Sequence, residues 1–204
     1  MATCEEIVQL EPLGFRRAAT ALASAFVGYD LMVYASPDAV RRKRGVAALY
    51  AAILADCFRL GVVHVTRDGT GAACWLRPGT PAPGLWRQIR SGMLKLPFSF
   101  GWRAFNRLLP YDVIARRLHH DHASMPHWYL AAIGVEPERQ GQGVGSALMQ
   151  PILALADRDH IACYLETHRP ANVRLYERHG FDVVEHDQPP ELAIGVWGML
   201  RKPR

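Results

Sequence analysis

Residues 129–181 decide the fold, and they read YLAAIGVEPERQGQGVGSALMQPILALADRDHIACYLETHRPANVRLYERHGF. The pattern predicts a strand, a glycine-rich turn, a helix, a second strand and a short helix that ends at Gly180. The turn, Gln140 to Gly145, leads directly into the helix. Alternating glycines allow several backbone N–H groups to point into one concavity, and a helix N-terminus adds partial positive charge. We therefore predict an anion site at this turn, with a pyrophosphate as the anion.

The turn differs from two common phosphate-binding motifs. No Lys followed by Ser or Thr comes after the glycines, which excludes a P-loop. The glycines also lack the G-x-G-x-x-G spacing of a Rossmann dinucleotide site. Glu166 lies near the end of the next predicted strand, where a Rossmann fold has an acidic residue, so that criterion alone leaves this alternative open. The predicted hairpin before the unit and the lack of a second βαβ half argue against it.

The composition is typical of one globular domain, which we expect to span residues 1–204. Half of the residues are hydrophobic and 21% are charged, and the length is sufficient for a core. No apolar run is long enough to cross a bilayer, and the first ten residues are acidic where a signal peptide would be basic. We expect a cytoplasmic protein that does not bind membranes. The four cysteines are widely spaced without a ligand pattern, so we expect reduced thiols and no metal site.

The net charge is +5, and part of it comes from the run Arg41-Arg42-Lys43-Arg44. A basic run can mark a surface that binds nucleic acid or a membrane. A charge run alone has no recognition pattern, however. We interpret these residues as a solvated helix face, and we do not expect nucleic acid as a partner.

The rest of the chain predicts an α/β protein with a central βαβ unit. Before the central unit we expect a strand within 5–13, helices at 15–27 and about 38–60 with Ser36 or Asp38 as the second N-cap, and a hairpin of strands at 62–66 and 72–76. From residue 128 we expect strands at 128–135 and 161–165, helices at 144–157 and 172–178, and final strands at 181–185 and 193–200. Between these parts lies segment 80–126, which is rich in Pro, Arg and aromatic residues. We predict two or three short amphipathic helices there, joined at Pro97 and Pro110.

Two motifs resemble those of the GCN5-related N-acetyltransferase (GNAT) superfamily. The first is I-G-V-E-P at 133–137 followed by Q-G-Q-G-V-G at 140–145, which fits the acetyl-CoA signature Q/R-x-x-G-x-G/A. The second is L-E-T at 165–167, then Asn172, L-Y-E-R at 175–178 and G-F at 180–181. The wording PHWYLAAIGV, YLET, YERHGF and the terminal W-x-M-x-RKP looks most like the puromycin N-acetyltransferase branch. The detailed resemblance covers the chain from about residue 127 onward, and upstream it is only architectural.

The resemblance implies a mixed, mostly antiparallel central sheet flanked by helices, with 80–126 as a helical insertion that shapes the acceptor site. It also implies acetyl-CoA as co-substrate. The backbone of Ile133, Gly134 and Val135 would bind the pantetheine arm and polarise the thioester carbonyl. Backbone amides of Gln140, Gly141, Gln142, Gly143, Val144, Gly145 and Ser146 would bind the pyrophosphate. Asn172 would hold a pantetheine amide, and Tyr176 would lie near the sulfur and donate a proton to the leaving thiolate.

The implied reaction is a direct attack of a neutral amine on the thioester. An ammonium group has no lone pair, so the reaction needs a base. Glu166, at the end of a predicted buried strand, is the first candidate, acting directly or through water, and His168 and His127 come next. A partly buried carboxylate or imidazole can have a pKa near the operating pH.

We therefore expect an N-acetyltransferase that acts on a primary amine of a small molecule, as a monomer or a homodimer. Aromatic residues of segment 80–126 would form either core or the wall of the acceptor pocket. Two alternatives remain open. One is a non-catalytic acyl-CoA-binding regulatory protein, against which the presence of Tyr176 and Glu166 argues. The other is a protein- or tRNA-directed acetyltransferase, for which the basic run at 41–44 is the only support.

Overall fold

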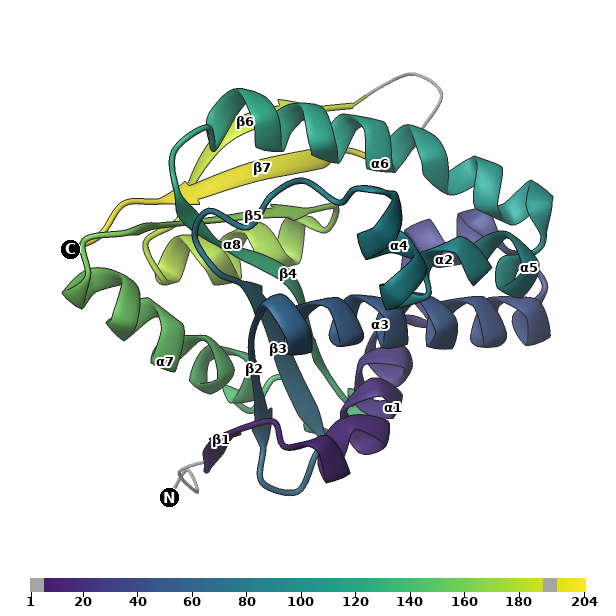
Figure 1. The fold of residues 1–204 in the computed structure, drawn as a ribbon, viewed down its shortest axis with the longest axis horizontal. Coiled ribbons are helices and arrows are strands. Elements are labelled where there is room, and N and C mark those ends of the chain that lie inside the picture. Colours follow the sequence, from purple (N-terminus) through teal and green to yellow (C-terminus); the bar gives the residue numbers. More distant parts are fainter. Residues whose placement is uncertain (1–5, 189–193) are drawn as a thin grey trace.

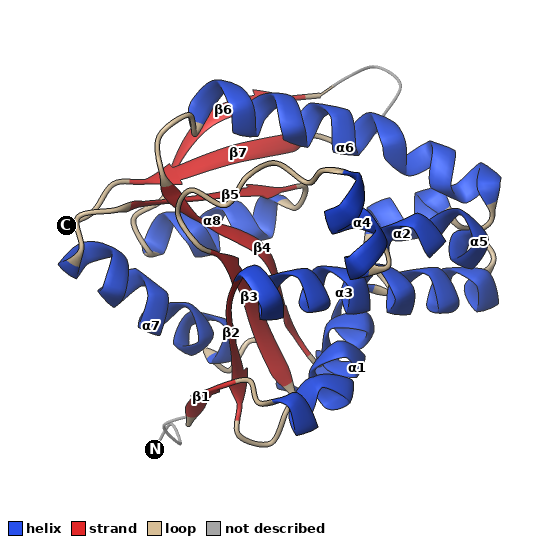
Figure 2. Ribbon diagram, viewed as in Figure 1, coloured by secondary structure: helices blue, strands red, loops and turns tan. Residues whose placement is uncertain are grey.

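The computed structural model describes residues 6–188 and 194–204, which form one sheet with helices on both of its faces (Figures 1 and 2). The strands are β1 (Ile7–Gln9), β2 (Gly61–Thr66), β3 (Gly71–Leu76), β4 (His127–Val135), β5 (Ala162–Thr167), β6 (Asp182–Asp187) and β7 (Val196–Arg201). The α-helices are α1 (Phe15–Phe26), α2 (Asp30–Ala35), α3 (Ala39–Leu60), α4 (Leu85–Ser91), α5 (Leu96–Phe100), α6 (Trp102–His122), α7 (Val144–Arg158) and α8 (Pro170–Arg178).

The sheet has seven strands in the order β1-β2-β3-β4-β5-β7-β6. Only β4 and β5 are parallel, and every other neighbouring pair is antiparallel. The parallel pair is connected through α7, as the central βαβ unit requires. The predicted fold class, a mostly antiparallel sheet flanked by helices, is confirmed. Two ends of predicted strands, residue 5 and Ala193, lie outside the described residues.

Two separate hydrophobic cores hold the helices to the sheet. On one face, side chains of α1, α3 and α5 such as Leu22, Leu54 and Phe100 are fully buried. On the other face, α7 and α8 pack on the sheet, and Leu148 and Ile152 are fully buried beside strand residues. Figure 1 shows α7 and α1 on opposite sides of the central strands. No helix of the described part of the chain is both long and apolar enough to cross a membrane.

The helix starts follow local chemistry. The Asp38 carboxylate accepts a hydrogen bond from the Arg41 backbone N–H at 2.7 Å, so Asp38 is the N-cap of α3. Close packing of α1 on β4 explains Gly134. A Cβ atom at that position would lie 2.9 Å from the Ala25 Cβ, a distance that real contacts essentially never show. The glycine there therefore serves the contact between α1 and the sheet.

The prediction that Pro110 joins two short helices is wrong. Pro110 lies inside α6, which runs for 21 residues, whereas Pro97 stands at the start of α5 as a helix-initiating proline. A proline in a helix interior removes one backbone hydrogen bond and costs about 3 kcal/mol. Packing of α6 along β7 and β6 offsets this cost, and Leu118 is fully buried there (Figure 1). The sequence also gave no indication of α2.

The strands β4 and β5 pair only briefly before they part. Their parallel register consists of three pairs and ends at Tyr129 and Tyr164. Beyond this point β4 stays paired with β3 as far as Val135, and β5 stays paired with β7 as far as Thr167. A register shift against β3 skips Ala131, which is consistent with a bulge that bends β4 at the parting. Among the described strands, none pairs with the edge of β4 that faces β5 from residue 130 onward.

Candidate active site

The glycine turn forms an open, uncapped helix N-terminus. Gly141 and Gly143 have φ of +75° and +82°, a conformation that strains any residue with a side chain. Gly143 is the N-cap of α7, and no side chain caps the helix. The first backbone N–H groups of a helix have no partner within the helix, so those of α7 are available to a ligand. A Cβ atom added at Gly145 would meet nothing within 4 Å, so the space beside the first turn of α7 is open.

The other predicted cofactor residues lie along the same route. Ile133, Gly134 and Val135 form the end of β4 beyond the parting point. The side-chain amide of Gln140 donates to the Val135 carbonyl at 2.9 Å, which fixes the entrance to the glycine turn. Gln142 donates to the Glu138 carbonyl at 3.0 Å, and Val144 is buried under the first turn of α7.

Two further predicted cofactor residues belong to the region where α7 and α8 meet. The Ser146 hydroxyl is 2.9 Å from Nε2 of His179, so this hydroxyl already ties α7 to the end of α8. Asn172 lies in the first turn of α8 and is half-buried, and its backbone N–H donates to the Arg169 carbonyl at 3.0 Å. The Asn172 side chain forms no hydrogen bond within the described residues, which leaves its amide available to a ligand.

Glu166 is the central ionisable group of the site. It extends from β5 just past the point where β4 and β5 part, and its side chain is only 4% exposed. The Tyr129 hydroxyl donates to Oε2 of Glu166 at 2.8 Å. Atom Oε1 is buried without a hydrogen-bond partner among the described residues, and it faces Nδ1 of His119 at 3.6 Å.

Burial controls the protonation of Glu166. It raises the pKa of this carboxyl group to about 8, against an ordinary 4.5, and the hydroxyl groups of Tyr129 and the nearby Tyr164 counteract only part of the rise. Asp112 of α6 raises the pKa a little further by its negative charge. A carboxyl group whose pKa lies near neutral pH can both take and release a proton during turnover.

Tyr176 reaches the site from α8. Its side chain is 5% exposed, and its ring packs edge-on against Phe181 with 5.9 Å between the ring centroids. Burial raises the pKa of its phenol well above the ordinary 10, and the nearby Tyr29 adds to the rise. The phenol therefore keeps its proton at neutral pH, and the hydroxyl forms no hydrogen bond within the described residues. A neutral donor of this kind has the protonation state required to protonate a leaving thiolate.

The two histidines predicted as further base candidates are in different surroundings. His168 lies edge-on to the rings of Tyr29 and Tyr111, and burial lowers its pKa to about 4. His127 is the first residue of β4, and its Nε2 lies 2.9 Å from Nε2 of His119. The structure thus brings His127 toward Glu166 through His119 and places His168 among the phenols.

Besides the predicted Tyr176, further tyrosines lie in the region of Glu166. Six of the seven tyrosines gather around the parting of β4 and β5, and they are Tyr29, Tyr50, Tyr111, Tyr129, Tyr164 and Tyr176. The alternation of side chains along a strand could have identified two of them, because Tyr164 shares a face of β5 with Glu166 and pairs with Tyr129. Tyr111 is one of the aromatic residues of segment 80–126 that were expected to form core or pocket wall, whereas no sequence signal identified His119; α6 supplies both.

The aromatic residues of segment 80–126 have three different environments. Phe100 is core, Tyr111 lies beside the Glu166 site, and Trp86, Phe98 and Trp102 are exposed. The exposed residues Trp86, Phe98 and Trp102 are therefore not part of the core. Arg87 of α4 forms a bidentate ion pair with Asp56 of α3, with a shortest distance of 2.6 Å, which attaches the segment to the domain.

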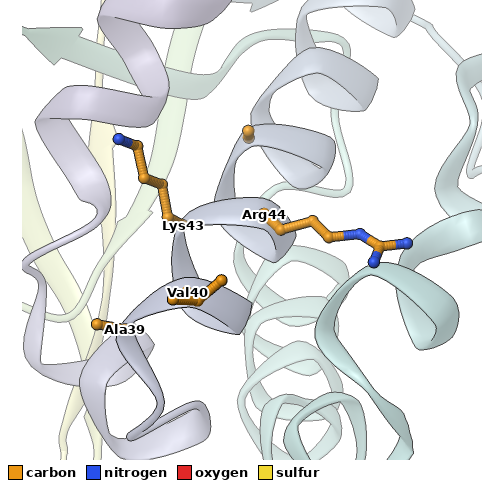
Figure 3. A pocket seen from close by; sticks show the side chains of 5 residues that line it. Ala39, Val40, Lys43 and Arg44 are labelled. Atoms are coloured by element: carbon orange, nitrogen blue, oxygen red, sulfur yellow. The ribbon is translucent and has the colours of Figure 1, made fainter.

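The basic run at 41–44 is only partly a solvated helix face. The Arg42 guanidinium donates to the carbonyl groups of Val27, Ser36 and Pro37 at 2.8 to 3.1 Å, so it holds the chain between α1 and α3. Lys43 and Arg44 border a surface hollow on α3, together with Ala39, Val40 and Ala47 (Figure 3). Their side chains extend in different directions (Figure 3). The hollow contains none of the residues around Glu166.

The cysteines that the structure describes, Cys57, Cys74 and Cys163, are buried free thiols. Burial raises the pKa of Cys163 to about 12, so this thiol is inert at neutral pH. Cys4 lies outside the described residues. Within residues 6–188 and 194–204, no three His, Cys, Asp or Glu side chains are grouped so that they could hold a metal ion.

Comparisons with known proteins connect this geometry to acetyl transfer. The family model described as "Acetyltransferase (GNAT) family" matches residues 109–181. An "Uncharacterized N-acetyltransferase" of Schizosaccharomyces pombe is 28% identical over 185 residues, which are 85% of this chain and 72% of that protein.

Solved structures share the fold over nearly the whole chain. A structure described as histone acetyltransferase HPA2 and related acetyltransferase, from Corynebacterium glutamicum, superposes with a TM-score of 0.68 at 21% identity, covering 99% of this chain and 98% of that one. An insect putative arylalkylamine N-acetyltransferase 7 from the yellow fever mosquito gives 0.65 at 14% identity, covering 96% and 86%.

The raised pKa of Glu166 predicts a pH-dependent stability. Between the unfolded value near 4.5 and the folded value of about 8, the folded chain holds a proton that the unfolded chain releases. Stability from this group is therefore full below pH 4.5 and is lost as the pH rises toward 8. Glu166→Gln lacks this titration, so it should gain on the order of 2 to 4 kcal/mol over the wild type between pH 5 and pH 8. Urea unfolding at both pH values measures the gain.

The matched control is Glu177→Gln, which alters an exposed carboxylate on α8. It should unfold like the wild type at both pH values. If Glu166→Gln and the wild type differ by the same amount at pH 5 and pH 8, Glu166 does not titrate in this range and the description of its environment is wrong.

Proposed function

Because the chain belongs to the GNAT superfamily, whose members are acetyltransferases, we propose that it transfers an acetyl group from acetyl-CoA to a primary amine of a small molecule. The observation that supports this most strongly is the position of Glu166. A buried carboxyl group with a pKa of about 8 lies where β4 and β5 part, beside the neutral phenol of Tyr129. Such a group suits the removal of a proton from an ammonium.

The residues present fit acetyl-CoA as co-substrate. The uncapped N-terminus of α7, with open space at Gly145, suits a pyrophosphate because backbone N–H groups and the helix dipole both favour an anion. The unpaired edge of β4 after Tyr129 has backbone groups that an extended pantetheine arm could pair with. The free side-chain amide of Asn172 would bind the same arm. When bound, the co-substrate supplies the thioester that the amine attacks.

The proposed reaction uses one base and one acid. The acceptor enters as an ammonium and loses a proton to the Glu166 carboxylate, directly or through water. The neutral nitrogen then attacks the thioester carbon, so that an N–C bond forms and the C–S bond breaks. Tyr176 donates its hydroxyl proton to the leaving sulfur and regains one from the acetylated nitrogen. The balance for each turnover is one amide, one thiol and one proton released to solvent.

The lining of the site supports an apolar or aromatic amine as acceptor. The phenols of Tyr29 and Tyr111 and the neutral imidazole of His168 lie together next to Glu166, and aromatic faces of this kind bind flat apolar groups. The neighbour from the yellow fever mosquito is named as an arylalkylamine N-acetyltransferase. Four other expectations from the sequence stay predictions. They are similarity to the puromycin branch, a monomeric or homodimeric state, a cytoplasmic location and a role of segment 80–126 in shaping the acceptor site.

A first prediction concerns the pyrophosphate site. Gly145 has ordinary helical backbone geometry and open space, so Gly145→Asp should fold normally. The new carboxylate would lie where the pyrophosphate is proposed to bind and would repel it, so the affinity for coenzyme A should fall at least about tenfold. Titration calorimetry with coenzyme A measures this. Gly84→Asp, at an equally open glycine outside the site, is the control. Equal affinities of the two variants would exclude the proposed pyrophosphate site.

A second prediction concerns the base. In a thiol-release assay with a panel of amines, kcat/KM should rise with pH, reach half its maximum near pH 8 and level off above it, as Glu166 loses its proton. Glu166→Gln should lower the rate about a hundredfold and remove this titration, whereas Glu177→Gln should behave like the wild type. If the wild type binds coenzyme A but releases no thiol with any amine, the chain is a non-catalytic acyl-CoA-binding protein instead.

A third prediction concerns the acid. Tyr176→Phe retains the buried ring and removes only the hydroxyl, so kcat should fall roughly ten- to hundredfold while the KM for acetyl-CoA changes little. Tyr34→Phe, which alters an exposed tyrosine of α2, should leave both values unchanged. An unchanged kcat in Tyr176→Phe would show that another group protonates the sulfur.

A further inference from the structure

Two histidines, His119 and His127, form a line of contacts that leads from Glu166 to the exposed Met125. Oε1 of Glu166, which has no other partner among the described residues, faces Nδ1 of His119 at 3.6 Å. Nε2 of His119 lies 2.9 Å from Nε2 of His127. Nδ1 of His127 lies 2.6 Å from the backbone carbonyl oxygen of Met125, a residue that is 76% exposed. Each imidazole thus has one nitrogen on the side of Glu166 and the other on the side of Met125.

The contact between His127 and the Met125 carbonyl determines the tautomers of both imidazole rings. A carbonyl oxygen only accepts hydrogen bonds, so Nδ1 of His127 has the proton. In the neutral ring Nε2 of His127 is then an acceptor, and Nε2 of His119 must donate to it. Nδ1 of His119 therefore has a free lone pair, and Oε1 of Glu166 is 3.6 Å from this nitrogen. The position of the proton on each of the two rings thus follows from one acceptor, the backbone carbonyl of Met125.

We propose that His119 and His127 form a proton relay that takes the proton released in each turnover from Glu166 to solvent. The proposal rests on the acetyltransferase function, because that reaction releases one proton per amide formed. Protonated Glu166 gives its proton from Oε1 to Nδ1 of His119. His119 gives its Nε2 proton to Nε2 of His127, and His127 gives its Nδ1 proton to water when its bond to Met125 opens. Glu166 is again a carboxylate.

After the transfer, each imidazole has the opposite tautomer. Both rings are partly exposed, so exchange of protons with water restores the resting tautomers. The gap of 3.6 Å between Glu166 and His119 is too long for a hydrogen bond and has to shorten during transfer. Catalytic hydrogen bonds are often long in structures without substrate and tighten when it binds.

The groups around His119 favour a neutral imidazole at rest, and the ring would be cationic only during a proton transfer. The rings of Tyr129 and Tyr164 pack against the His119 ring in tilted orientations, and burial and the neighbouring His127 lower the pKa of His119 to about 4. Tyr111 and Asp112, which belong to α6 like His119, also interact electrostatically with Glu166. His119 lies in the last turn of α6, where the helix dipole favours a positive charge and so stabilises a passing imidazolium.

The resting tautomers can be tested without any turnover. Two-dimensional ¹⁵N NMR of the histidine-labelled wild type at pH 7 distinguishes protonated from bare ring nitrogens. We expect protons on Nε2 of His119 and on Nδ1 of His127, with the other two nitrogens bare. Protons on Nδ1 of His119 or only on Nε2 of His127 would overturn the relay. This measurement does not depend on the identity of the amine, so it stands even if the proposed function fails.

The transport role is tested by kinetics with an amine that the wild type acetylates. His119→Phe retains an aromatic ring between Tyr129 and Tyr164 but cannot transfer a proton, so kcat should fall about tenfold or more. Added imidazole should restore the rate in proportion to its concentration, which a purely structural defect would not allow. His127→Gln should behave in the same way. The control is His120→Gln, at the exposed neighbour on α6, and it should match the wild type.

Two kinetic results would contradict the relay. One is a wild-type kcat in both His119→Phe and His127→Gln. The other is a loss of rate that imidazole does not restore, which would assign these histidines to packing alone.

Discussion

The parting of β4 from β5 is the constraint on which the rest of the site depends. Parallel strands normally continue pairing, because an unpaired backbone edge is costly unless something else satisfies it. Here the pairing ends after Tyr129 and Tyr164, since β4 is held to β3 and β5 to β7. The divergence leaves a backbone edge that an extended ligand could pair with, and Glu166 lies on β5 just beyond the last pair. It also allows Tyr176 to approach from α8 on the opposite face.

The groups around Glu166 explain why the pKa of its carboxyl group lies near neutral pH. A lysine or arginine at this position would form an ion pair, keep the carboxylate charged and lower its pKa. The groups that face Glu166 are instead neutral phenols, a neutral imidazole and the more distant Asp112. Burial without a cation destabilises the charged form, and this cost in folding stability is what brings the pKa toward neutral pH. The function proposed for Glu166 and its destabilising effect thus have the same physical cause.

The parts of the structure that local sequence pattern determines could be predicted best from the sequence. The strands, the uncapped glycine turn and the order of elements from 127 onward follow from periodicity and glycine chemistry, and Glu166 and Tyr176 lie within motifs. Pro110 was misinterpreted because helix propensity is a local property, whereas the burial of Leu118 against the sheet is tertiary. His119 could not be predicted at all, because its distance from Glu166 depends on how α6 packs across strands remote in sequence.

The burial of Glu166 would also limit how the proposed amine acceptor could reach it. With a side chain only 4% exposed, Glu166 accepts from Tyr129 on one oxygen and faces His119 with the other. Each carboxylate oxygen has two acceptor positions, so an incoming proton can arrive without breaking either contact. Direct contact with an acceptor nitrogen would require the surrounding phenols to move, which favours a bridging water or the Tyr129 hydroxyl. A proton that arrives at Oε2 would then reach Oε1 by rotation of the carboxyl group, and from Oε1 it could pass to His119.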